Sequence, residues 1–200
     1  MRTFLFLMTL LFASAPTFAA RTILVFGDSL SAGYGLPTGA AWPNLLEARL
    51  REGRLDYSVA NLSISGETTD GGLARLPEAL RRHRPAVVVL ELGANDGLRG
   101  LPLARVRQNL QTMIAASKKA GARVLLVGMR LPPNYGPYAE QFNASFAQIA
   151  KSEKVAFSGF FFEGFADQPE YFLPDMLHPN AKAQPRLLDN LWPALQPLLQ

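Results

Sequence analysis

Two hydrophobic patterns alternate along this 200-residue chain. In one, apolar residues run without a break and end at glycine or polar residues, which is typical of strands buried on both faces of a parallel sheet. In the other, apolar residues recur every three or four positions, which is typical of amphipathic helices. The first pattern predicts strands in 22–26, 86–92 and 124–128 and within 155–161, and strict alternation predicts another in 57–62.

The helical pattern fills the intervals between these strands. It predicts helices in 42–50, in 69–83, around 103–114, around 138–149, and in a closing segment around 187–195. Gly53 and Gly121 end two of them, as glycine commonly does at helix C-termini. Because strands and helices alternate regularly, we expect one three-layer α/β/α domain with a parallel sheet, covering residues 20–200 without an internal boundary or repeat.

The first twenty residues follow neither pattern. A positively charged start precedes an apolar run, 4–12, that is too short for a stable anchor, and small residues follow up to Ala19. This order predicts a secretory signal peptide over residues 1–19, and therefore a periplasmic or secreted mature protein. Cleavage after Ala15 would leave Pro16 at the new N-terminus, which is unfavourable. An uncleaved anchor or a buried helix are the remaining interpretations.

Composition narrows the possible functions. The net charge is +4, but the basic residues are scattered, and the densest cluster, 81–84, falls where a helix should end. Nucleic-acid binding is therefore not expected. The chain has no cysteine and only two histidines, which excludes disulfides and thiolate chemistry, and no residues have metal-ligand spacing. We expect no metal site.

Polar residues suited to acyl transfer follow the predicted strands. Such chemistry needs a hydroxyl nucleophile, an imidazole base, a carboxylate that orients the imidazole, and N–H donors for the oxyanion. Ser29 offers the hydroxyl, His178 the imidazole, and Asp175, three residues earlier, the carboxylate. The backbone N–H groups of Ser29 and Gly66 and the side-chain amide of Asn95 are candidate donors. In a parallel sheet these loops share one edge.

Each candidate also has a structural interpretation. Ser29 by itself fits a helix cap equally well, and His178, which precedes a proline, suits the first turn of a helix. His83 lies among arginines, where a structural or solvated role is the better interpretation. Asp28 and Asp96 are expected to brace their loops by hydrogen bonds.

Two further segments have a candidate binding role. Four phenylalanines either line an acyl pocket or belong to the hydrophobic core, which is the commoner role for this residue type: Phe160, Phe161, Phe162 and Phe165. The segment Leu131–Tyr138 is either a lid over the substrate or a plain surface loop.

Four sequence blocks, taken together, resemble the GDSL, or SGNH, hydrolase family. They are Gly27-Asp28-Ser29-Leu30, Gly66, Gly93-Ala94-Asn95-Asp96 and Asp175-Met176-Leu177-His178, in the family's usual order and over essentially the whole mature chain. The longer matches resemble the secreted bacterial thioesterase I/lysophospholipase L1/arylesterase subgroup. This resemblance implies a flavodoxin-like five-stranded sheet of order 2-1-3-4-5 and the SGNH hydrolase fold. The Gly-x-Ser-x-Gly elbow of other serine esterases is absent, so a looser turn is expected at Ser29.

The resemblance also implies a function. It implies cofactor-free hydrolysis of carboxylic esters, acyl thioesters and lysophospholipids, with Ser29 as nucleophile, Asp175 and His178 as its partners, and Ser29, Gly66 and Asn95 as oxyanion donors. A carbohydrate acetylesterase is the alternative within the family, and a non-catalytic lipid- or glycan-binding module is the alternative outside it. We expect a monomer without a stable membrane anchor.

Overall fold

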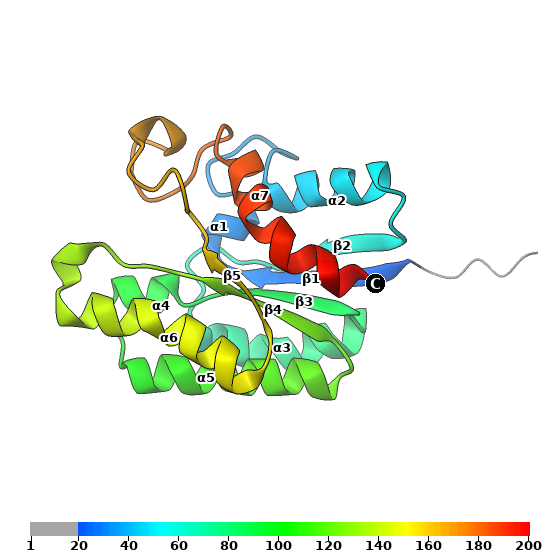
Figure 1. Ribbon diagram of the computed structural model, residues 1–200, viewed down its shortest axis with the longest axis horizontal. Coiled ribbons are helices and arrows are strands. Elements are labelled where there is room, and N and C mark those ends of the chain that lie inside the picture. The colour runs from blue at the N-terminus through cyan, green and yellow to red at the C-terminus, as the bar shows by residue number, and fades with distance from the viewer. Residues whose placement is uncertain (1–19) are drawn as a thin grey trace, which may run out of the picture.

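Five parallel strands form the centre of the fold, in the order β2-β1-β3-β4-β5 (Figure 1). The computed structural model describes residues 20–200, so the predicted signal peptide, 1–19, lies outside the described residues. The strands are β1 (Arg21–Gly27), β2 (Tyr57–Asn61), β3 (Val87–Glu91), β4 (Arg123–Gly128) and β5 (Ala156–Phe160). The predicted fold class and strand order 2-1-3-4-5 are confirmed.

Helices cover both faces of the sheet and make the three predicted layers. One face carries α2 (Trp42–Glu52) and α7 (Gln184–Leu195), and the other carries α3 (Thr69–His83), α5 (Leu103–Lys119) and α6 (Pro137–Glu153) (Figure 1). Because both faces are covered, all five residues of β3 are buried, which explains the unbroken apolar run. No helix within residues 20–200 is both long and apolar enough to cross a membrane.

Short helical turns lie at the carboxyl edge of the sheet and near the C-terminus, where the periodicity predicted none. They are α1 (Ser29–Ala32), α4 (Ala94–Leu98) and the 3₁₀ turns η1 (Pro133–Tyr135), η2 (Pro169–Tyr171) and η3 (Gln196–Leu199). Asp28, and not Ser29, caps α1, because its side chain accepts a hydrogen bond from the N–H of Leu30. A helix-capping role for Ser29 is therefore wrong.

His178 also differs from its expected place. The closing helix α7 begins only at Gln184, so His178 does not lie in the first turn of a helix. It lies instead in a turn in which Met176 has a φ of 57°. An isolated antiparallel bridge between Phe172 and Pro179 closes this turn, and the N–H of Leu173 donates to the carbonyl of His178 at 2.8 Å. Hydrogen bonds within this turn, and not helix geometry, hold the backbone of His178.

Candidate active site

The site begins where β1 meets α1. The strand delivers Asp28 and Ser29 to the carboxyl edge, and the Asp28 carboxylate fixes the turn by accepting the Leu30 N–H at 3.0 Å. Ser29 is the first residue of α1, so its own N–H has no partner within that helix. Both its hydroxyl and its N–H therefore lie at the sheet edge where ligands of open α/β folds bind.

Ser29, His178 and Asp175 form a continuous hydrogen-bonded chain. The Ser29 Oγ lies 2.9 Å from His178 Nε2, and His178 Nδ1 lies 2.7 Å from Asp175 Oδ2. The other carboxylate oxygen of Asp175 accepts the N–H groups of Leu177 and His178, at 2.9 and 3.0 Å. Since the carboxylate holds both the backbone and the ring of His178, the imidazole is fixed toward Ser29.

The pKa of Asp175 reflects these bonds. Burial raises it, but the hydrogen bonds from His178 and Leu177 outweigh burial and lower the pKa to about 2. The carboxylate is therefore ionised at every pH at which the protein is expected to work. The Tyr34 ring adds a lateral contact, with its centroid 4.4 Å from that of His178. His83 is not part of this site, because it ends α3 at the opposite edge of the sheet.

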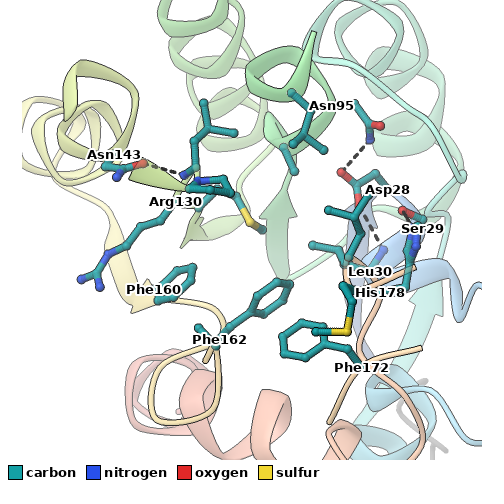
Figure 2. Close-up of a pocket in the computed structure, with 18 of the residues that line it drawn as sticks. Asp28, Ser29, Leu30, Asn95, Arg130, Asn143, Phe160, Phe162, Phe172 and His178 are labelled. Carbon is teal, nitrogen blue, oxygen red and sulfur yellow. Dashed lines mark hydrogen bonds between the residues drawn. The ribbon is translucent and has the colours of Figure 1, made fainter. Parts of the chain in front are cut away.

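Asn95 connects the three loops of the site. It lies in α4, and its Nδ2 donates to Asp28 Oδ2 at 3.0 Å (Figure 2). The same nitrogen donates to the carbonyl of Glu67, also at 3.0 Å. The carbonyl of the neighbouring Gly66 accepts the Arg99 guanidinium at 3.1 Å. Within residues 20–200, the N–H of Gly66 has no backbone or side-chain acceptor. The structure thus brings the Ser29, Gly66 and Asn95 loops together, with both Asn95 amide hydrogens engaged.

Asp28 is a buried carboxyl beside the candidate nucleophile. Burial raises its pKa to about 6, against the opposing effect of the hydrogen bonds from Leu30 and Asn95. Asp96 is also buried, and it accepts the hydroxyl and the N–H of Thr69 at 2.6 and 2.9 Å. Both aspartates therefore brace their loops, as predicted.

Glu91 is a residue that sequence reasoning missed. It is fully buried at the end of β3, and its Oε2 accepts the Ser31 hydroxyl at 2.6 Å and the Asp28 N–H at 3.3 Å. The Trp42 indole N–H donates to the same Ser31 oxygen at 3.2 Å. Burial, and next the neighbouring Asp28 charge, raise the pKa of Glu91 well above its usual range. The sequence signal that could have identified Glu91 is its position as the one charged residue in the apolar strand β3.

A cavity of about 570 Å³ opens beside Ser29. Ser29, Asn95 and His178 lie along one side of it, and Arg130, Phe160, Phe162 and Phe172 lie along the others (Figure 2). Of the four predicted phenylalanines, Phe160 and Phe162 line the cavity, whereas Phe161 and Phe165 are buried in the core.

The loop that begins at Leu131 forms a wall of this cavity. Leu131, Pro132 and Pro133 line it, and the Asn143 side chain accepts the Leu131 N–H at 2.8 Å. The Tyr138 hydroxyl donates to the carbonyl of Leu101 at 2.7 Å. The segment Leu131–Tyr138 is thus bound at both ends to neighbouring elements.

Known proteins match this chain over most of its length. Esterase TesA from Pseudomonas aeruginosa is 51% identical over 182 residues, which is 90% of either chain. Thioesterase 1/protease 1/lysophospholipase L1 from Escherichia coli is 45% identical over 197 residues, 98% of this chain and 92% of that protein. A crystal structure of TesA superimposes with a TM-score of 0.87 at 50% identity, covering 89% of this chain and 99% of the other.

The family comparison agrees with the geometry. The sequence profile of the GDSL-like lipase/acylhydrolase family matches residues 25–185, a range that includes the end of β1, Ser29, Asn95 and the Asp175–His178 turn. With this match, the two relatives above and the shared fold, the chain belongs to the GDSL-like lipase/acylhydrolase family.

Proposed function

We propose that this protein is a serine esterase that hydrolyses carboxylic esters and acyl thioesters through an acyl-enzyme on Ser29. The observation that carries the proposal is the 2.9 Å contact between Ser29 Oγ and His178 Nε2 beside an apolar cavity. Relatives named esterase and thioesterase 1/lysophospholipase L1 support the same substrate class.

The first half-reaction forms the acyl-enzyme. As Ser29 Oγ attacks the carbonyl carbon, its proton passes to His178 Nε2, and Asp175 stabilises the resulting imidazolium. The oxyanion accepts hydrogen bonds from the backbone N–H groups of Ser29 and Gly66 and from the side-chain amide of Asn95. For this, Asn95 shares with the oxyanion the amide hydrogen that it donates to Asp28 in the free protein. The imidazolium then protonates the departing alcohol or thiol, and the C–O or C–S bond of the substrate breaks.

The second half-reaction releases the acid. Water takes the place of the departed group, His178 Nε2 accepts its proton, and the hydroxide attacks the acyl carbon. The imidazolium returns a proton to Ser29 Oγ as the acyl–enzyme bond breaks. No group beyond these side chains and water is needed to balance the reaction.

The cavity supports an acyl chain as the part of the substrate that is bound. Its volume is within the range of small-molecule sites, and its lining is mainly apolar side chains. A carbohydrate acetylesterase needs polar side chains beside Ser29 that bind the hydroxyl groups of a sugar, and the mainly apolar lining of this cavity is less suited to that. Lysophospholipids and aryl esters present the same carbonyl with an apolar group and belong to the proposed substrate class. We also propose a monomer, exported to the periplasm or beyond by residues 1–19.

Hydrolysis of p-nitrophenyl esters from acetate to palmitate tests the proposal. The purified mature protein should turn over medium or long chains best, and Ser29→Ala should abolish turnover. Ser152→Ala is the matched control, because this serine donates only to the Ile149 carbonyl on α6, away from the cavity, and should leave turnover unchanged. Activity on acetate alone would favour the carbohydrate acetylesterase, and activity retained in Ser29→Ala would refute the assignment of the nucleophile.

A further inference from the structure

The exposed large hydrophobic side chains of residues 20–200 gather at one edge of the molecule. They are 38–54% exposed, and we call them the apolar ring: Tyr34, Ile64, Leu98, Met176 and Leu177. They come from the connections that follow β1, β2, β3 and β5, so all of them lie at the carboxyl edge of the sheet. An exposed apolar cluster of this kind marks an interaction surface more often than single exposed residues do.

The apolar ring surrounds the opening to Ser29. Three of its members, Leu98, Met176 and Leu177, also line the cavity. The Tyr34 ring contacts the His178 ring at a tilt of 38°, with the centroids 4.4 Å apart. Ile64 lies beside the turn that carries Ser29, since its N–H donates to the Gly27 carbonyl at 3.1 Å. Part of the exposed apolar surface is thus also the wall of the cavity.

The opposite edge has a different character. There α3 and α5 end, and the cations that complement the helix dipoles gather: Arg81, Arg82, Arg84, Lys118 and Lys119. No exposed large hydrophobic side chain of residues 20–200 lies at that edge. The two edges therefore offer distinct surfaces, one apolar around the site and one cationic away from it.

We propose that the apolar ring docks onto the surface of a lipid aggregate that contains the ester substrate. This inference rests on the proposed esterase function. A protein covering the ring would close the opening through which a substrate reaches Ser29. A lipid surface covers the same side chains and supplies the acyl chain directly into the cavity. Insertion of the ring removes exposed apolar area from water, which is the driving force for interfacial binding.

Vesicle co-sedimentation tests the docking apart from catalysis. The Ser29→Ala protein is mixed with phosphatidylcholine vesicles at about 0.5 M NaCl, where attraction to the cationic edge is screened. We expect it to sediment with the vesicles. Ile64→Ser in the same background should weaken partition about three- to tenfold, since a half-exposed isoleucine loses part of its apolar area. Lys119→Ser, at the cationic edge, is the matched control and should leave partition unchanged.

A fluorescent reporter makes the test independent of partition strength. Ile64→Trp should show a blue shift in emission when phosphatidylcholine vesicles are added, whereas Lys119→Trp should show none. Of the two native tryptophans, Trp42 is fully buried and Trp192 is half-buried on α7, so the parent protein, measured with and without vesicles, gives the background to subtract. A shift from Lys119→Trp alone would place the lipid at the opposite edge and overturn the proposal.

The remaining outcomes separate docking from the esterase function itself. With Ser29 present, Ile64→Ser should hydrolyse soluble p-nitrophenyl acetate at the rate of the parent protein. Loss of that activity would assign Ile64 to the reaction site and overturn its docking role. Absence of vesicle binding also overturns the docking proposal, as does an equal loss of partition in Ile64→Ser and Lys119→Ser. Neither outcome affects the esterase assay. A dimer in sedimentation velocity that Ile64→Ser dissociates would identify a second copy as the occupant instead.

Discussion

Asn95 Nδ2 donates to Asp28 Oδ2 at 3.0 Å and to the carbonyl of Glu67 at the same distance. One amide nitrogen therefore ties the nucleophile turn to the loop that contains Gly66. Hydrogen bonds between loops therefore assemble the proposed oxyanion site, and Asp28, next to Ser29, takes part in those bonds and not in the proposed proton relay.

Asp28→Asn tests this relationship. The substituted side chain keeps an oxygen that accepts the Leu30 N–H, but it places an NH₂ group against the NH₂ group of Asn95. The charge-assisted hydrogen bond from Asn95 to Asp28, worth about 1.5–3 kcal/mol, is therefore lost. We expect kcat for a p-nitrophenyl ester to fall by about tenfold or more, with a smaller change in KM. Asp56→Asn, at an exposed carboxylate on the opposite edge, should leave both constants unchanged. Equal kinetics in the two variants would show that Asp28 does not position Asn95.

The pH dependence of folding should also report on Asp28. Its pKa is about 6 in the folded protein and 3.8 in an unperturbed chain, because burial disfavours the charge. Between these values the folded protein holds a proton that the unfolded chain has released, so this group favours folding at low pH and the contribution is lost as pH rises through 6. Urea denaturation at pH 4.5 and 7.5 should show that Asp28→Asn loses less stability on alkalisation than the parent. Equal changes in the free energy of unfolding of the two proteins between these pH values would contradict the raised pKa of Asp28.

Glu91 should tolerate loss of charge but not loss of volume. Since the pKa of this buried carboxyl is raised well above its usual range, Glu91→Gln replaces one neutral group by another and can still accept from Ser31. Glu91→Ala leaves a void and removes the acceptor for Ser31 and the Asp28 N–H. We expect Glu91→Ala to lower the free energy of unfolding by about 2–4 kcal/mol, and Glu91→Gln by a smaller amount. If Glu91→Gln lowered the free energy of unfolding more than Glu91→Ala, the Glu91 carboxyl would be ionised in the folded protein.

Asp175→Asn addresses the proton relay. The amide can still accept the backbone N–H groups of Leu177 and His178, but it no longer offers a carboxylate to His178 Nδ1. By analogy with other serine hydrolases, kcat should fall by about 10²–10⁴-fold. Because the pKa of Asp175 is about 2 in the folded protein, its stabilising effect is present at neutral pH and is lost only in strong acid. Kinetics at pH 8 and thermal unfolding of the same variant measure the two effects. Unchanged kcat would remove Asp175 from the relay.

The sheet and its large helices were predictable because their periodicity extends over many residues. The spans predicted for 57–62, 69–83 and 155–161 agree with β2, α3 and β5 to within two residues. The candidates at strand ends were predictable for a related reason: parallel topology places the carboxyl ends of all strands at one edge, whatever the details of the loops.

Short and tertiary features were not predictable from the sequence. The helices α1 and α4 span four and five residues, too few for a 3.6-residue period to be recognised. The turn at His178 depends on the bridge between Phe172 and Pro179, which no local pattern shows. The buried position of Glu91 depends on Ser31, sixty residues away in sequence. Each of these features is therefore either shorter than a helical period or held by a contact that the periodicity does not report.

The contact between Ser29 and His178 spans 149 residues, from the end of the first strand to the turn before the last long helix. During synthesis Ser29 emerges early, but His178, the base proposed for it, follows only after β5 has been added. A chain truncated before Asp175 retains all five strands and the serine yet has no imidazole to activate it. Under the proposed mechanism, ester turnover therefore signals completion of the whole fold, because the nascent protein cannot hydrolyse esters until its final segment is in place.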